Sequence, residues 1–442
     1  MTWRASSKVL LSLSILAFWF FELSLHRYSS NFREIEAAFV LVQSLALSCF
    51  LVWCVTFIFL SRRTHDWLLV IFLSFAAIWF FSATHSSSDV LALVFGIALG
   101  KGTQVVLSGE NSKSEFRSFV IGLCVLLIFS SWWRLDMADN YYHGSRWMGL
   151  WDNPNTYGML MGAGGLLAIG LLVANAKMED GRWKIAGISS RRLLQGLLWT
   201  AIFMLGVGLV MSYSRGAWLA TGIGLTYLAW CYGKLKWKYM ALGAGLLAVG
   251  VLLFWGRTPD AAPWYLKRAD LGRPSAQHRA TAWRAGLEMM RDHPLGVGWN
   301  NAVSLYDKQY SPPEGGAAAI TTNDYMMIGT ELGIPALLCF VAYVGLCYRK
   351  SPRIQELEVR SQELEAGSQN PEFRIQNESE SLRAACLSGA LVFVVAFWFD
   401  GGLFKLPTAA MFWVLLELGS ARDNSHHAAQ VRQQPVSDRK LA

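Results

Sequence analysis

The sequence predicts an all-α polytopic membrane protein, and three observations lead to that fold class. Of the 442 residues, 53% are hydrophobic and only 16% are charged, whereas a soluble domain carries about 25% charged residues. The apolar residues form blocks of about 17–25 residues, the length of a helix that spans a membrane. Many of the 20 tryptophans stand near block ends, as expected at the membrane–water interface. This composition excludes a soluble enzyme, a disordered chain and a disulfide-stapled secreted domain.

Each apolar block is expected to be a helix, because every backbone group in lipid must be hydrogen-bonded within the protein. We predict about 12 transmembrane helices on this basis. Their ranges are 9–25, 37–60, 67–83, 89–107, 118–134, 157–174, 193–213, 215–232, 238–255, 323–348, 383–400 and 404–419. The fourth is the weakest, since Lys101 and Gln104 interrupt it.

The distribution of lysine and arginine predicts the orientation. Basic residues concentrate in the loops near residues 62, 113, 182, 236 and 350, and these loops alternate with loops that hold far fewer. Cytoplasmic loops carry this excess, so both termini are expected in the cytoplasm.

The predicted organisation follows from the spans and the orientation. It comprises transmembrane helices 1–9 in residues 1–255, a large helical extracytoplasmic (periplasmic) loop 256–322, helices 10–12 in 323–420 with a cytoplasmic linker 349–382, and a disordered cytoplasmic tail 421–442.

Several other classes of chemistry are not indicated. The net charge of +8 is explained by the cationic loops of a membrane protein, so lipids rather than nucleic acid are the expected partners. The seven cysteines form no CxxC pair, and the eight histidines form no HExxH. The sequence also lacks a P-loop and a Rossmann fingerprint. We therefore expect no metal and no cofactor.

The segment SYSRGAW, residues 212–218, is the first candidate for chemistry. It places Arg215 between the seventh and eighth predicted helices, at the outer face, with apolar residues on both sides. A guanidinium at a membrane edge binds phosphate through two parallel hydrogen bonds, which lysine does less well. An arginine that merely extends to the lipid headgroups is the alternative.

A helix predicted over residues 275–293 of the outer loop supplies the second candidate. Arg279, Trp283, Leu287 and Met290 recur at the spacing of one helical face. This face is expected to meet the membrane domain, where an arginine is costly unless it meets an anion. A structural ion pair is the alternative.

Two short motifs accompany these arginines. In PLGVGWNN, residues 294–301, the GxG pattern is a weak phosphate-loop signal, and a tight turn is the favoured interpretation. In the NPN segment, Asn155 suits either a helix N-cap or a binding role. Arg146 precedes it and adds a third outer cation.

In order and spacing, these motifs resemble the O-antigen ligase and O-antigen polymerase family of bacterial envelope glycosyltransferases. The resemblance covers roughly residues 146–338, about half the chain, and includes TNDYM at 322–326 and ELGIP at 331–335. It implies a multi-pass enzyme of the bacterial inner membrane that transfers a glycan from undecaprenyl diphosphate to lipid A–core or to another lipid-linked glycan. The reaction is expected to be inverting and metal-independent.

The resemblance also implies site residues. Arg215 and Arg279 match the family's diphosphate-binding arginines. The neighbouring residues expected to bind substrate are Arg146, Asn155, Ser214, Trp283, Trp299, Asn300 and Asn323.

One position departs from the family's pattern. Ligases usually carry a histidine just before the Asn-x-Tyr segment, and here that position is Thr322 or Thr321. Neither hydroxyl is a base at neutral pH, so another group is expected to accept the acceptor's proton. Glu314 and Asp324 are the first candidates, followed by His278 and His293.

Alternative functions remain open at this point. A polymerase of O-antigen or exopolysaccharide fits the same motifs, and the missing histidine favours it over a ligase. A transporter, which buries charges at mid-membrane, and an inactive glycan-binding relative are the two non-enzymatic alternatives.

Overall fold

The computed structural model describes residues 63–421, with gaps. The gaps are 64, 83–86, 108–112, 134–140, 143–145, 152, 177–183, 186–187, 233–273, 312–321 and 350–370. The predicted helices at 9–25, 37–60 and 238–255, and most of the linker and tail, lie outside the described residues.

Eight of the nine predicted spans that fall in the described part each coincide with one helix, and the ninth, 323–348, contains a long helix only in its second part, which gives nine corresponding helices. These are α3 (Asp66–Ser82), α4 (Ser87–Leu107), α5 (Lys113–Trp132), α6 (Pro154–Ala176), α7 (Ser190–Met211), α8 (Arg215–Cys231), α14 (Ile334–Arg349), α16 (Pro371–Ala396) and α17 (Leu406–Ser420). Helices α4, α5, α6, α7 and α16 are long and apolar enough to cross a membrane. Helices α3, α14 and α17 are shorter apolar helices. A multi-pass helical membrane protein is thus supported, while the total number of spans stays a prediction.

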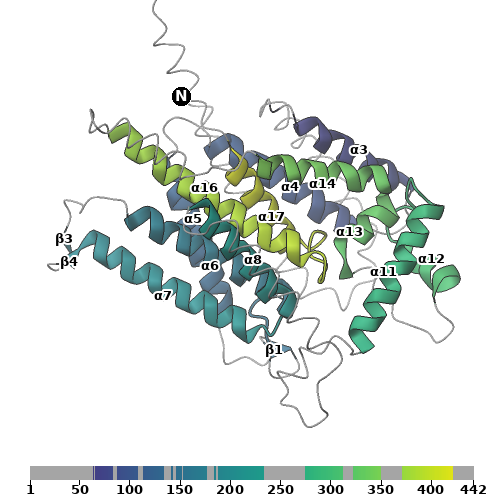
Figure 1. Ribbon diagram of the computed structural model, residues 1–442, viewed down its shortest axis with the longest axis horizontal. Helices are drawn as coiled ribbons and strands as arrows, with labels where there is room; N and C mark the ends of the chain where they lie inside the picture. The colour runs from purple at the N-terminus through teal and green to yellow at the C-terminus, as the bar shows by residue number, and fades with distance from the viewer. Residues whose placement is uncertain are drawn as a thin grey trace, which may run out of the picture.

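Shorter elements complete the described chain. They are α11 (Pro274–Asp292), α12 (Asn301–Leu305), the π-helical turn η3 (Tyr306–Tyr310), α13 (Asp324–Met327), the π-helical turn η5 (Ile328–Leu332), and the antiparallel pairs β1 (Tyr141–Tyr142) with β2 (Arg146–Trp147) and β3 (Lys184–Ile185) with β4 (Ile188–Ser189). Figure 1 shows the long helices side by side, with α11 and α12 beyond one end of the bundle.

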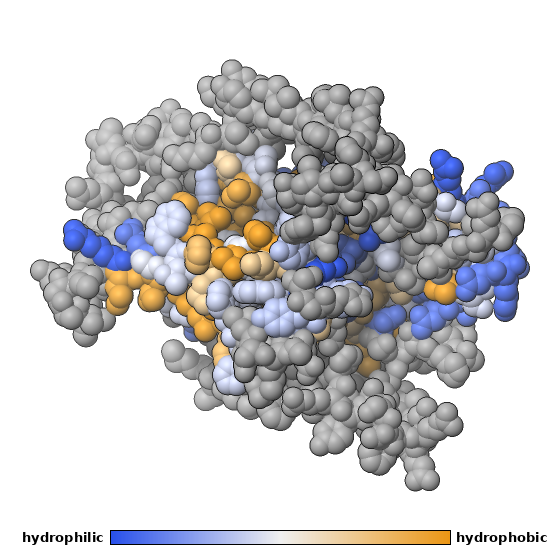
Figure 2. Space-filling view, turned by 90° about the horizontal axis from the view of Figure 1, so that it is seen from below, coloured by the Kyte–Doolittle hydropathy of each residue, from blue (hydrophilic) through white to orange (hydrophobic). Residues whose placement is uncertain are grey.

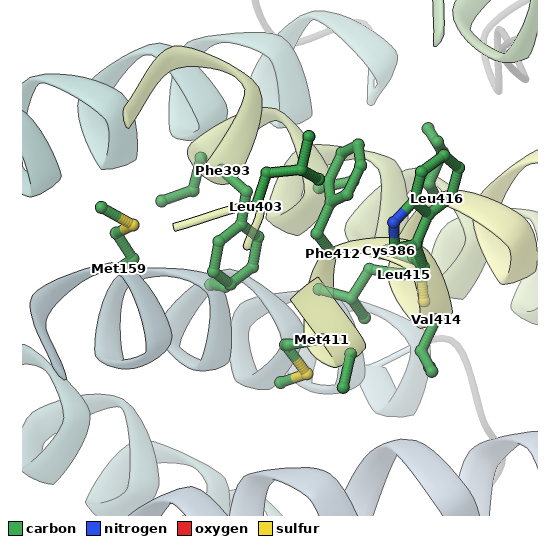
Figure 3. Packing of buried hydrophobic residues seen from close by; sticks show 14 of the residues in the cluster. Met159, Cys386, Phe393, Leu403, Met411, Phe412, Val414, Leu415 and Leu416 are labelled. Carbon is green, nitrogen blue, oxygen red and sulfur yellow. The ribbon is translucent and has the colours of Figure 1, made fainter. Parts of the chain in front are cut away.

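Helices α4, α6, α16 and α17 form the centre of the bundle. Figure 3 shows how side chains of three of them meet: Met159 from α6, Phe393 from α16, and Met411 and Phe412 from α17. In the apolar segment of α4, 83% of the residues are buried, whereas in that of α7 only 22% are. Exposed apolar side chains of α7 include Trp199 and Phe203. Figure 2 shows apolar surface gathered on one face of the molecule, which is the surface that lipid would cover.

Two glycines let α4 and α17 approach closely. A Cβ atom at Gly100 would lie 2.7 Å from the carbonyl oxygen of Trp413, and one at Gly96 would lie 3.1 Å from that of Ala409. Small residues at helix contacts are typical of membrane bundles, because the backbones can then pack directly. Helix α4 is therefore an inner helix despite its polar residues.

The polar residues that interrupt α4 are paired inside the bundle. Lys101 Nζ lies 2.5 Å from Asp66 Oδ1 and 3.0 Å from Glu417 Oε2, and all three side chains are buried. Arg63 contacts the same Glu417 carboxylate at 3.3 Å, and Tyr343 donates a hydrogen bond to it. Two cations thus face two carboxylates, and the group carries no net charge.

The span predicted over residues 323–348 is not one continuous helix. It consists of α13, the turn η5 and α14, and the chain bends at Gly333, whose φ is +97°. A Cβ atom at this glycine would lie 2.5 Å from the carbonyl carbon of Leu295. The bend exists because the turn that follows α11 packs directly against Gly333.

Candidate functional site

Several elements that carry the predicted site residues meet at one end of the bundle, called here the site end. Helices α6 and α8 begin there, α7 and α16 end there, and α11 lies next to it. Residues far apart in sequence are thereby brought together around the loop between α16 and α17, residues 397–405.

The turn between α7 and α8 places Arg215 at a helix start. Tyr213 takes a φ of +47°, an unusual conformation for a residue with a side chain. Ser214 is the N-cap of α8, and its side chain accepts a hydrogen bond from the backbone N–H of Ala217. Ser214 thus has a structural task. Arg215 is the first residue of α8 and is exposed.

Asp400, which the sequence reasoning did not select, lies at the centre of the predicted site residues. Its Oδ1 accepts a 2.9 Å hydrogen bond from Asn155 Nδ2 and lies 3.4 Å from Arg279 Nη2. On the other side of the amide, Asn155 Oδ1 accepts a 2.7 Å hydrogen bond from Arg146 Nη2. Asp400 is therefore linked to two arginines from two separate elements.

Asn155 does not serve as the N-cap of α6. That task falls to Asn153, whose Oδ1 accepts a 2.7 Å hydrogen bond from the backbone N–H of Asn155. The Asn155 side chain is left to bridge Arg146 and Asp400. Arg146 is further fixed by a 2.9 Å hydrogen bond from its Nε to the carbonyl oxygen of Ser212.

The electrostatic environment of Asp400 combines burial with several cations. Burial is the larger effect and raises the pKa of this carboxyl above its ordinary value. Four cations act in the opposite direction and lower it: Arg279, Lys405, Arg146 and Arg215. One carboxylate thus faces four positive charges, so the cluster keeps an excess of positive charge in which a further anion is stabilised.

Gly216 makes room for this carboxylate. A Cβ atom at position 216 would lie 2.8 Å from Asp400 Oδ2 and 3.3 Å from Phe399 Cβ. The glycine of the SYSRGAW motif is therefore required by the close approach of α8 to the 397–405 loop.

Helix α11 carries Arg279 towards the bundle, but its buried face differs from the predicted one. Arg279 does face the 397–405 loop, where it meets Asp400. Leu287, expected on the same buried face, is exposed. Ala282, Ala285 and Met289 are buried instead, so the helix is rotated from the predicted face because small residues allow closer contact with α13 and η5.

The residues 294–301 form a tight turn, as favoured from the sequence. Gly296 and Gly298 both have positive φ, and the backbone N–H of Gly298 donates to the carbonyl of Glu331 at 2.9 Å. Trp299 is fully buried, and its indole N–H donates to the carbonyl of Ala76 in α3. Asn300 takes φ +59° at the start of α12. This geometry assigns Trp299 to packing rather than to contact with a sugar.

The TNDYM segment is fixed by hydrogen bonds to the backbone. The Asn323 side chain caps α13 by accepting from the N–H groups of Tyr325 and Met326. Asp324 is buried, and its Oδ2 accepts from the N–H groups of Gly402 at 2.7 Å and Leu403 at 2.8 Å. Asp324 thus holds the loop that carries Asp400, and this task does not favour it as a base.

The remaining candidate residues divide between the site edge and the undescribed ranges. Trp283 packs edge-to-face against Trp398, with ring centroids 5.7 Å apart, so two tryptophans lie near the Arg279–Asp400 pair. His293 is exposed. Glu314 lies outside the described residues, as does the side chain of His278. Among the described residues, no three His, Cys, Asp or Glu side chains are grouped as for a metal ion.

The sequence contains a signal for Asp400. It is an acidic residue followed by two glycines, directly after the uncharged apolar residues 384–399. A carboxylate is costly at a membrane edge unless cations surround it, and the arginines predicted at the same face supply them.

Comparisons with known proteins bear on these residues. A search of curated proteins gave no match. The O-antigen ligase family model matches residues 200–341. The matched range includes Arg215 and Arg279, whereas Arg146, Asn155 and Asp400 reach the site from outside it. The chain is thus similar to the O-antigen ligase family over residues 200–341, the family that the motifs were predicted to resemble.

Proposed function

We propose that this protein transfers a glycan from undecaprenyl diphosphate to an acceptor at the outer face of the bacterial inner membrane. The family model implies glycan transfer of the ligase or polymerase type from lipid-linked substrates. We add three points to this family-level function: undecaprenyl diphosphate carries the donor glycan, the acceptor is lipid A–core or another lipid-linked glycan, and transfer takes place at the outer face of the membrane.

The observation that carries the proposal is the cation cluster at the site end. Arg146, Arg215 and Arg279 come from β2, α8 and α11, and all three act on Asp400 together with Lys405. A lipid-linked diphosphate must present its charged group at the end of the transmembrane helices, where this cluster lies. Guanidinium groups suit it because they bind phosphate oxygens bidentately.

The same cluster has a chemical role during transfer. As the acceptor hydroxyl attacks the anomeric carbon, the bond to the diphosphate breaks and the diphosphate gains a negative charge. Cations fixed in advance at that position stabilise the transition state, and loss of one such donor typically costs about 2.7–4 kcal/mol. The contacts of Arg146 with Ser212 and Asn155 supply such fixation.

The sugar is expected to lie towards Trp283 and Trp398. Trp398 is 40% exposed, and it stands two residues before Asp400. Trp398 also contacts the ring of Tyr325. An exposed aromatic surface beside the cations fits the apolar face of a sugar ring. Trp283 and Trp398 are therefore better candidates for stacking than the buried Trp299.

The proton acceptor remains a separate proposal. Thr322 occupies the position of the family's histidine, and Glu314 and Asp324 were the first alternatives from the sequence. Because Asp324 already accepts two backbone hydrogen bonds, we place Glu314 ahead of it. A general base typically contributes about 10²–10⁴-fold, so Glu314→Gln is expected to slow transfer within that range.

Three alternatives are kept. Polymerisation uses the same donor and differs only in the acceptor, which is then another lipid-linked glycan. An inactive glycan-binding relative would bind donor without transfer. A transporter is expected to bury charges within the membrane, and Lys101 is the main candidate for such a charge. The charge of Lys101 is balanced by Asp66 and Glu417, which supports a structural role instead.

The test is transfer by the purified full chain in lipid vesicles. The donor is an undecaprenyl-diphosphate-linked glycan, and lipid A–core and a second donor molecule are offered as acceptors. Arg215→Ala and Arg279→Ala should each reduce transfer at least about 100-fold, and lysine at either position should restore it only partly. Arg291→Ala is the matched control, because Arg291 lies on α11 and is exposed.

The outcomes separate the alternatives. Transfer to lipid A–core indicates a ligase, and growth of a longer lipid-linked glycan indicates a polymerase. Full transfer by both alanine variants would refute the proposed anion site. A reporter fused at residue 275 tests the orientation, because an extracytoplasmic enzyme such as a phosphatase should be active there.

A further inference from the structure

Asp400 places a negative charge among the cations of the proposed diphosphate site, which is unusual for a site that binds an anion. A site that binds diphosphate is not expected to hold a carboxylate, because like charges repel. Yet Asp400 Oδ1 lies 3.4 Å from Arg279 Nη2, and this side chain is only 11% exposed. The carboxylate therefore occupies a position at which Arg279 would meet a bound anion.

The two contacts of Asp400 differ in strength. The hydrogen bond from Asn155 is 2.9 Å long. The contact with Arg279 is longer and is made through one nitrogen, and the Arg279 side chain is 34% exposed. A long contact through one nitrogen is weaker than a short, bidentate pair between arginine and a carboxylate. Arg279 can thus change its partner at low cost, while Asn155 keeps Asp400 in place.

A diphosphate is a stronger partner for Arg279 than Asp400 is. It offers more negative charge and pairs of oxygens that match the guanidinium group. The remaining cations around Asp400, namely Arg146, Arg215 and Lys405, would then balance both anions.

We propose that Asp400 is the resident counter-ion of the empty site, which a diphosphate displaces from Arg279 and which pairs with Arg279 again when the product leaves. The carboxylate keeps its hydrogen bond to Asn155 throughout, and so keeps Arg146 in position. Asp400 is in this sense a positioning residue, and its repulsion lowers the affinity for the leaving diphosphate. This inference rests on the proposed function.

The first experiment measures binding of inorganic diphosphate, without added metal, to the purified full chain in lipid nanodiscs. Asp400→Asn keeps the size of the side chain but removes its charge. This variant should bind diphosphate roughly tenfold more tightly than the unchanged protein, since one repulsive charge near the anion is gone. Glu288→Gln is the control, because Glu288 is an exposed carboxylate on α11, and it should bind as the unchanged protein does.

The second experiment measures turnover. With Asp400→Asn, the KM for the lipid-linked donor should fall about tenfold, and inhibition by undecaprenyl diphosphate should strengthen by a similar factor. A merely structural role would predict a higher KM, since loss of Asp400 would disorder the arginines. Asp400→Ser also removes the charge and should shift binding in the same direction as Asp400→Asn. It replaces Asp400→Asn in both experiments if the asparagine variant does not fold.

The results distinguish this inference from the proposed function. If Arg215→Ala and Arg279→Ala weaken diphosphate binding but the Asp400 variants bind equally or more weakly, only the counter-ion inference is overturned. If the arginine variants bind diphosphate as the unchanged protein does, the anion site itself is wrong. Tighter binding by the Asp400 variants, with weaker binding by the arginine variants, supports both.

Discussion

Asn155 Nδ2 donates a 2.9 Å hydrogen bond to Asp400 Oδ1, although the two residues are 245 positions apart in the chain. The contact joins the first turn of α6 to the loop between α16 and α17. Because Asn155 also accepts from Arg146, one amide side chain connects a cation and an anion of the site. The positions of both depend on it.

We expect Asn155→Ala to impair transfer while the protein still folds. The change removes the hydrogen bond between Asn155 and Arg146 and leaves the buried Asp400 without its shortest hydrogen bond, so transfer should fall about tenfold or more. Asn153→Ala is the matched control in the same turn. It removes the N-cap contact, so it should cost about 1 kcal/mol of stability and leave the rate of transfer nearly unchanged. Equal effects of the two variants on transfer would contradict the bridging role of Asn155.

Gly216→Ala should damage the site through sterics alone. The new methyl group would lie 2.8 Å from Asp400 Oδ2, so either the carboxylate or the start of α8 must move. We expect transfer to fall at least about tenfold, since small displacements at a preorganised site are costly.

A second glycine of α8 provides the control for this change. A Cβ atom at Gly222 would have no neighbour within 4 Å. Gly222→Ala should therefore leave transfer unchanged and stabilise the helix by up to about 1 kcal/mol. Both variants are compared by rate of transfer and by melting temperature in detergent. Full activity of Gly216→Ala would mean that the approach of Asp400 to α8 does not matter.

Helix positions could be predicted from the sequence, because length and hydropathy alone decide whether a segment spans lipid. Eight of the nine predicted spans within the described residues each coincide with one helix, whereas the span 323–348 is divided into α13, η5 and α14. The bend at Gly333 could not be predicted, because it depends on contact with Leu295. The buried face of α11 was mispredicted at Leu287, since a hydropathy pattern does not show that small residues such as Ala282 give the closer packing.

The site was predictable in part. Arg215 and Arg279 could be selected as candidates because an isolated arginine among apolar residues is expensive without an anion. Asp400 was missed because its significance depends on cations contributed by β2, α8 and α11, and a single sequence does not show that these elements converge. Asn155 was left between two interpretations, which only the position of Asn153 resolves.

Lys101 is expected to stabilise the packing of helices at the end of the bundle opposite the site end. Lys101→Ala would leave Asp66 and Glu417 buried without their shared cation. Breaking a buried ion pair typically costs about 3–5 kcal/mol. The variant should therefore melt at a lower temperature or fail to accumulate, whereas Arg284→Ala, which changes an exposed residue of α11, should not. If the purified Lys101→Ala protein keeps the melting temperature of the unchanged chain, this group does not stabilise the fold.

The stability of the protein is expected to depend on pH through Asp400. Burial raises the pKa of Asp400 above its ordinary value of 3.8, in spite of the four surrounding cations. The folded protein therefore binds this proton more tightly than the unfolded chain does. This contribution to stability is fully present below the pKa that Asp400 has in the unfolded chain. It is lost as the pH rises through the pKa that Asp400 has in the folded protein.

Asp400→Asn isolates this effect, because the variant cannot titrate at position 400. Melting temperatures of both proteins are measured in detergent from pH 3 upwards, and only their difference is compared. The unchanged protein should lose stability relative to Asp400→Asn as the pH rises above about 4, and the difference should level off once Asp400 is ionised. In Arg279→Ala this loss should extend to higher pH, because Arg279 is the largest of the cationic effects that lower the pKa of Asp400. A gain of stability by the unchanged protein over the same interval would mean that the cations outweigh burial.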